Sequence, residues 1–175
     1  CFKSFTIENP STAFASDTGD IESNSPFGDF IDDMSQVTID WDSLISKAEI
    51  VPISGLVYSK KSETPRQTNN RVLTASNLCL RTGKIDTSAK LIYLEESFVI
   101  DETLCPQKGD IVISKASGSL KHLGKAIYID ENLPGHAVGG FLMILRFSNE
   151  KLGKAIFYRL LSKKFRLYVA SLKGQ

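Results

Sequence analysis

The sequence lacks the cysteine pairs that hold small secreted domains or zinc sites together. Its three cysteines, Cys1, Cys79 and Cys105, form no CxxC pair. A disulfide framework or a cysteine-based zinc site needs more cysteines at closer spacing. We therefore predict reduced thiols, with Cys79 packed as a small hydrophobe.

Long apolar runs are also missing. No stretch approaches the roughly 20 residues that span a bilayer. The opening ten residues, CFKSFTIENP, lack the apolar centre of a signal peptide. We therefore expect a cytoplasmic protein without a membrane partner. Because the first residue is a cysteine, we interpret the chain as a fragment or a processed product.

The common catalytic and nucleotide-binding motifs are absent as well. The sequence contains no GxxxxGK[ST] phosphate loop, no HExxH, no GxSxG and no GxGxxG after a strand. Four acids do lie close together, but around an apolar FVI they indicate a solvated strand edge more than a metal site: Glu95, Glu96, Asp101 and Glu102. We expect no catalytic residue, no metal and no cofactor in this chain.

What the sequence does contain is a strong segregation of charge. The whole chain has a formal net charge of +1. Residues 1–45 hold nine acids and one base, a charge of −8, while the remainder holds 20 bases and 11 acids, a charge of +9. Attraction to phosphates supplies much of the affinity of DNA-binding proteins. A positive domain that is merely soluble fits the same numbers, so charge alone leaves both interpretations open.

Composition divides the chain into a leader and one domain. A length of 175 residues fits one ordinary domain with an appendage. Residues 1–36 are predicted to be an acidic, weakly ordered leader or linker, because Ser, Thr, Asp, Gly and Pro dominate them. The domain covers residues 37–175, and VTIDW at its start alternates like a short strand.

The domain has the pattern of short strands followed by helices. The expected strands are residues 50–59, 71–75, 90–94, 110–114, 125–130 and 137–147. Strands so close in sequence cannot be parallel strands joined by helical crossovers. From residue 151 onward apolar residues recur at helical spacing, which predicts one or two helices. The predicted fold class is α+β: a curved, largely antiparallel sheet or small β-barrel with C-terminal helices packed on it.

The most informative stretch is residues 109–126, GDIVISKASGSLKHLGKA. Its β-branched residues, Ile111 to Ile113, favour a buried strand. Gly118 and Gly124 allow the following loop to turn sharply and to approach a ligand closely. The hydroxyl, ammonium and imidazole groups of that loop are of the kind that contacts phosphates and base edges.

A series of motifs in a fixed order extends this picture. They are WDSLISKAEIVPISGLVYSKK, RVLTASNLCLRTGKID, LCPQKGDIVISKASGSLKHLGKAIYIDE, GGFLMILRF and the basic helix AIFYRLLSKKFRLYVASLKG. From Trp41 to the C-terminus this order resembles a target-recognition domain. Such domains belong to the DNA specificity subunits of type I restriction-modification systems and to related adenine methyltransferases. The resemblance implies a module that binds one half of a split DNA target without catalytic residues of its own.

The same resemblance implies two DNA-contacting loops. The residues expected in the first are Lys60, Lys61, Arg66, Gln67, Asn69, Asn70 and Arg71. Those expected in the second are Lys115, Ser117, Gly118, Ser119, Lys121, His122 and Lys125. Gln67, Asn69, Asn70 and His122 are the candidate base readers. The flanking lysines are expected to hold phosphates.

The implied partners are double-stranded DNA and a methyltransferase subunit or domain, which would bind S-adenosylmethionine. A restriction subunit is a further candidate partner. Two alternatives remain open. One is a nonspecific nucleic-acid-binding β-barrel module, which the charge fits equally well. The other is a serine-lysine peptidase-like domain, because a KGDIVI strand followed by serines and lysines occurs in such enzymes, with Ser54 and Lys115 as the dyad.

Overall fold

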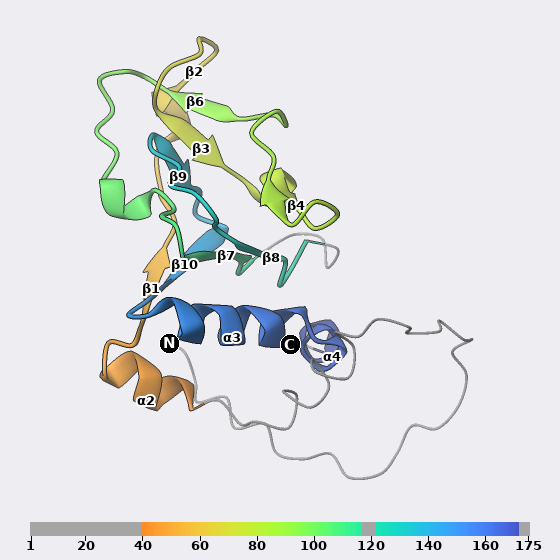
Figure 1. Ribbon diagram of the computed structural model, residues 1–175. Coiled ribbons are helices and arrows are strands. Elements are labelled where there is room, and N and C mark those ends of the chain that lie inside the picture. The colour runs from red at the N-terminus through yellow and green to blue at the C-terminus, as the bar shows by residue number, and fades with distance from the viewer. Residues whose placement is uncertain (1–39, 117–121, 172–175) are drawn as a thin grey trace, which may run out of the picture.

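A computed structural model describes residues 40–116 and 122–171 of the chain (Figure 1). Its first sheet is antiparallel throughout and has the strand order β1-β10-β7-β8. The strands are β1 (Ile50–Ser54), β10 (Leu142–Phe147), β7 (Ile111–Ser114) and β8 (Ala126–Tyr128). This sheet lies at the centre of the molecule, between the helices and the second sheet (Figure 1).

The second sheet has the order β2-β6-β3-β9. Its strands are β2 (Glu63–Thr64), β6 (Ile92–Leu94), β3 (Arg71–Leu73) and β9 (His136–Val138). The pair β3 and β9 is parallel, and the other pairs are antiparallel. A further hairpin joins β4 (Leu78–Cys79) to β5 (Lys84–Ile85). Three 3-10 helices complete this half: Lys60–Ser62, Ala75–Asn77 and Glu102–Leu104.

Three α-helices lie on the other side of the first sheet (Figure 1). They are α2 (Trp41–Ser46), α3 (Glu150–Leu161) and α4 (Lys163–Ser171). Asn149 caps α3 by accepting a hydrogen bond from the Leu152 amide at 2.8 Å. Ser162 separates α3 from α4, since its hydroxyl donates to the Arg159 carbonyl and accepts from the Phe165 amide.

The alternation of side chains along the first sheet creates two cores. Ile111, Ile113 and Met143 point toward the helices and pack with Ile156 and Leu160 of α3. The residues between them point the other way, and they pack with the second sheet: Val112, Leu142 and Ile144 meet Leu73 and Val138. Both faces of the first sheet are therefore buried, which explains the unbroken apolar run in β7.

A buried ion pair fixes β7 beside β10. Arg146 donates from Nε to Asp110 Oδ1 at 3.0 Å and from Nη2 to Oδ2 at 2.8 Å. The Asp110 side chain is only 3% exposed and also accepts the Gln107 amide at 2.8 Å. The pKa of Arg146 is raised, first by its hydrogen bond to Asp110. The Asp of the GDIVI motif therefore has a structural role.

A second fixed point joins the two sheets. Leu56 follows β1 and forms a parallel bridge with Gly139, which follows β9. A Cβ at Gly55 would collide with the Gly139 carbonyl, and one at Gly139 would lie 2.9 Å from the Leu73 carbonyl. Only glycine fits at these two positions, because three backbones meet there.

Asn77, part of another motif in the series, is completely buried. Its Oδ1 accepts the Thr74 amide at 2.8 Å, and its Nδ2 donates to the Asp86 carbonyl at 2.9 Å. These bonds close the β4–β5 hairpin onto the end of β3. The SNL and GKID segments are thus the two sides of one buried hydrogen-bonded junction.

The predicted α+β class with largely antiparallel sheets is confirmed, and the sheets are open, so the barrel form of the prediction does not apply. The prediction of one or two C-terminal helices is also confirmed, since there are two, α3 and α4. The predicted strand through VTIDW is wrong at Trp41, which begins α2, because Asp40 accepts the Ser43 amide as a helix cap. The predicted strand 137–147 is two strands in different sheets, since the chain changes sheet at Gly139 and Gly140.

The division between leader and domain remains a prediction, because residues 1–39 lie outside the described part of the chain. In residues 40–116 and 122–171 no helix is long and apolar enough to cross a membrane.

The ion pair yields a stability prediction. Replacing Asp110 with alanine leaves the Arg146 guanidinium half-buried without its carboxylate, so the free energy of unfolding should fall by about 3 kcal/mol. Urea denaturation measures this change. The matched control is Asp130→Ala, which breaks the exposed pair with Lys84, whose side chains are 66% and 60% exposed. That variant should lose less than about 1 kcal/mol. Equal losses in both variants would contradict the structural role of Asp110.

Candidate nucleic-acid interface

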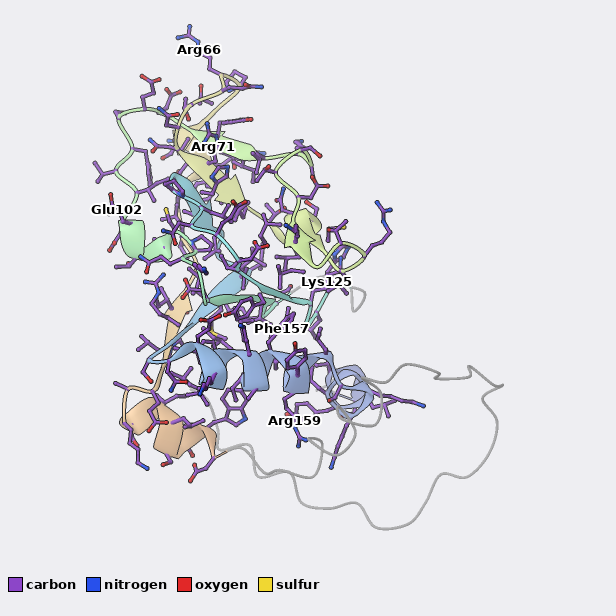
Figure 2. All side chains as sticks on the ribbon, in the orientation of Figure 1. Arg66, Arg71, Glu102, Lys125, Phe157 and Arg159 are labelled. Atoms are coloured by element: carbon purple, nitrogen blue, oxygen red, sulfur yellow. The ribbon has the colours of Figure 1, made fainter. Side chains whose placement is uncertain are left out.

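The first predicted loop lies at the far end of the second sheet from the helices (Figure 1). Its 3-10 helix, Lys60–Ser62, begins at Ser59, whose hydroxyl accepts the Lys61 amide at 3.4 Å. Residues 65–70 connect β2 to β3, and Figure 2 shows Arg66 projecting outward at the tip. Lys60, Lys61 and Arg66 are exposed, as are the two amide side chains Gln67 and Asn69.

Two side chains anchor this loop to the sheet. Thr68 is buried, and its hydroxyl donates to the Leu94 carbonyl at 2.7 Å. Asn70 donates from Nδ2 to the carbonyls of Glu95 at 2.9 Å and Phe98 at 2.8 Å. The amide hydrogens of Asn70 are therefore engaged within the protein, although the sequence predicts a base reader there. Thr68 was not among the predicted site residues. The sequence signal for it is weak, namely that a threonine hydroxyl in a loop commonly hydrogen-bonds to backbone groups.

The other side of the loop rests on the chain before β9. Arg71 pairs with His136 in the parallel ladder, and its amide donates to the Gly135 carbonyl at 2.9 Å. Gly135 has φ +69°, and a Cβ there would lie 2.6 Å from the Asn69 carbonyl. Burial lowers the pKa of His136, and the charge of Arg71 lowers it further. Arg71 is half-buried, so it borders the loop but does not lie on its exposed tip.

The tip of the loop keeps its positive charge. Among the residues that the structure describes, the ion pairs are Lys84 with Asp130, Arg146 with Asp110 and Lys154 with Glu150. None of them involves Lys60, Lys61 or Arg66. Glu63 is the acid closest in sequence, and it accepts a hydrogen bond from the Tyr58 hydroxyl at 3.4 Å. The pKa of Tyr58 is raised by burial and then by the Glu63 charge.

Acids are present at the base of the same loop. Glu95 and Glu96 follow β6 and are exposed, and the carbonyl of Glu95 accepts the Asn70 amide. The Glu95 amide donates to the Ser62 carbonyl at 2.9 Å, so Lys60 and Lys61 lie near these acids, whereas Arg66 projects from the tip (Figure 2). A polyanion that approaches the tip meets the Arg66 guanidinium first, which restricts the directions from which it can approach.

The second predicted loop is only partly covered by the structure. Ser117, Gly118, Ser119 and Lys121 lie outside the described residues. Lys125 is half-buried beside β8, and its Nζ donates to the Leu78 carbonyl at 3.5 Å. The Nδ1 atom of His122 is also buried, and it has no hydrogen-bond partner among the described residues. Gly124 has φ +69° and packs against Val169 of α4.

The structure separates the two loops. Figure 2 shows Arg66 at the outer tip of the second sheet and Lys125 beside the first sheet, at the β4 hairpin. Lys115 is exposed at the end of β7. Its Nζ donates to Ser54 Oγ at 3.1 Å, which brings together the two residues of the peptidase alternative. Both side chains are exposed to water, whereas a lysine that serves as a base needs surroundings that disfavour its ammonium form.

No family model and no curated protein matches the sequence. Within residues 40–116 and 122–171, no group of three His, Cys, Asp or Glu side chains is arranged to hold a metal ion. The interpretation of the site therefore depends on its own residues.

The anchoring of the first loop is testable. Asn70→Ala removes the side-chain hydrogen bonds to the Glu95 and Phe98 carbonyls and a longer one to the Glu96 carbonyl, so the free energy of unfolding should fall by about 1 to 2 kcal/mol. Amide hydrogen exchange in residues 65–69 should also become faster. The control is Asn69→Ala, an exposed neighbour, which should change stability by less than about 0.5 kcal/mol. Unchanged exchange in the Asn70 variant would show that the loop is held by other contacts.

Proposed function

We propose that this chain is a sequence-specific double-stranded DNA recognition module of a restriction-modification system. It binds one half of a split target for a separate adenine methyltransferase or restriction subunit, and it has no catalytic residues of its own. Those partners supply the chemistry, and S-adenosylmethionine binds to the methyltransferase. The motif resemblance suggests this role, and the geometry of the first loop is the observation that supports it best.

That geometry suits recognition because the loop combines exposed donors with a fixed base. Thr68 and Asn70 anchor the end of this loop that leads into β3, while Arg66, Gln67 and Asn69 stay exposed. An arginine donates two hydrogen bonds to guanine, and an amide side chain pairs with adenine. A preorganised loop loses little entropy when it binds, so its contacts contribute more to affinity. Lys60 and Lys61 are then placed to hold phosphates.

The test is a selection of bound sequences from random duplex DNA at moderate salt. We expect the chain to enrich one motif. Lys60→Ala and Lys61→Ala should weaken binding to all sequences, and each should reduce the slope of log K against log salt by about 1. Arg66→Ala should instead relax the preference at one target position, at a cost of about 1 to 3 kcal/mol.

The control for this test is Lys47→Ala. Lys47 is exposed and directly follows α2, at the opposite end of the molecule from β2 (Figure 1). The substitution removes one positive charge far from the proposed interface. Because salt screens distant surface charges, the affinity and the salt slope should stay within about twofold of those of the parent chain. Equal losses from Lys47, Lys60 and Arg66 would indicate nonspecific attraction, which is the β-barrel-type alternative without sequence preference.

The second candidate function is that of a serine-lysine peptidase, because Lys115 Nζ lies 3.1 Å from Ser54 Oγ. A fluorophosphonate probe separates the two functions, because an activated serine attacks its phosphorus, displaces fluoride and becomes phosphonylated, in a step analogous to acyl-enzyme formation. On the proposed function the chain stays unlabelled. Labelling that disappears in both Ser54→Ala and Lys115→Met would establish a hydrolase instead.

A further inference from the structure

An exposed aromatic residue, Phe141, lies beside the residues with which the second loop begins. Phe141 is 70% exposed, although it directly precedes the fully buried Leu142 of β10. Its carbonyl accepts the amide of Lys115 at 3.0 Å and that of Ala116 at 3.3 Å. These two bonds hold the backbone of Phe141, in the turn before β10, beside the residues that follow β7.

Two contacts bring three residues of different chemistry close together. The pairing of β10 with β7 ends at Leu142 and Ser114, and just beyond it the Lys115 amide donates to the Phe141 carbonyl. Met143 is opposite Ile113, and directly opposed residues in an antiparallel pair point to the same side. Ser54 is paired with Met143 on the other flank of β10 and shares that side, in agreement with its hydrogen bond to Lys115.

A second exposed apolar side chain lies near the turn that holds Phe141. Val57 is 86% exposed, and its Cγ2 would lie 3.5 Å from a Cβ at Gly140, the residue before Phe141. We call Ser54, Val57, Lys115 and Phe141 the Phe141 patch. Exposed apolar residues that occur singly need no explanation, but here two adjoin a lysine and a hydroxyl at the start of a predicted recognition loop.

We infer that Phe141 is an apolar base reader that packs against the 5-methyl group of a thymine in the DNA target. The inference rests on the proposed function. Aromatic contact with this methyl group is one of the ways in which proteins distinguish thymine in the major groove. Lys115 supplies the adjacent positive charge that attracts the phosphate backbone, and Ser54 holds its ammonium group in place.

A nucleic acid suits this patch better than an apolar protein surface. The patch is small and includes a charged amine, whereas the centres of protein interfaces are depleted of lysine. Its position also matters, because Lys115 and Ala116 lead directly into the loop that carries Ser117, Ser119 and Lys121 in the sequence.

Replacement of thymine by deoxyuridine tests the inference, because it removes only the methyl group. In the selected target, each thymine is replaced in turn, and the affinity of the whole chain is measured. One position should lose about fourfold, the value of one buried methyl. Phe141→Ala should weaken binding to the thymine target by at least that factor and should no longer distinguish thymine from deoxyuridine at that position.

The matched control is Val99→Ala, which truncates a side chain that is 89% exposed in the loop after β6. It should leave both affinity and thymine preference unchanged. Thermal unfolding of Phe141→Ala should match that of the parent chain, since the ring is mostly in solvent. A Phe141→Ala chain that still distinguishes thymine from deoxyuridine overturns the inference, as does a parent chain that is indifferent at every position. In both cases the proposed function still stands if the chain selects a motif from random duplex DNA. If it selects no motif, the proposed function itself is contradicted.

Discussion

The ion pair between Asp110 and Arg146 is the contact on which the arrangement of the first sheet depends. A carboxylate that is 3% exposed needs its partner, because an unpaired buried charge is strongly unfavourable. Arg146 donates two hydrogen bonds to it and a third to the Cys105 carbonyl at 3.3 Å. These bonds hold the start of β7 against the end of β10. The opposite ends of the same two strands then carry Lys115 and Phe141, so one rigid pair of strands positions the start of the second loop.

The first loop is held by a different principle. Among the described residues no ion pair anchors it, and the end that leads into β3 is fixed by neutral hydrogen bonds from Thr68 and Asn70 to the backbone around β6. Its cations, Lys60, Lys61 and Arg66, stay exposed. The two surfaces belong to different sheets, which meet at Gly55 and Gly139. On our proposal, the spacing of the two DNA contacts depends on this junction, where a side chain larger than hydrogen does not fit.

Local patterns in the sequence predicted the main strands of both sheets and the C-terminal helices, but they missed the short strands β2, β4 and β5 and placed the end of β1 too late. They also did not predict which groups are free. The apolar run before Lys115 and the helical spacing after residue 150 are strong periodic signals. The break between β9 and β10 is set by the close approach of Leu73, a contact distant in sequence. In the same way, Asn70 has the side chain of a base reader, yet its amide group donates hydrogen bonds to carbonyls 25 to 28 residues away.

The central claim is that binding distinguishes sequences and does not merely follow charge. The most direct measurement is the ratio of two affinities of the whole chain at moderate salt, one for its selected duplex and one for a shuffled duplex of equal length and composition. Our account predicts a ratio of roughly 10³ or more. A ratio near one, with the same salt dependence for both duplexes, would contradict it.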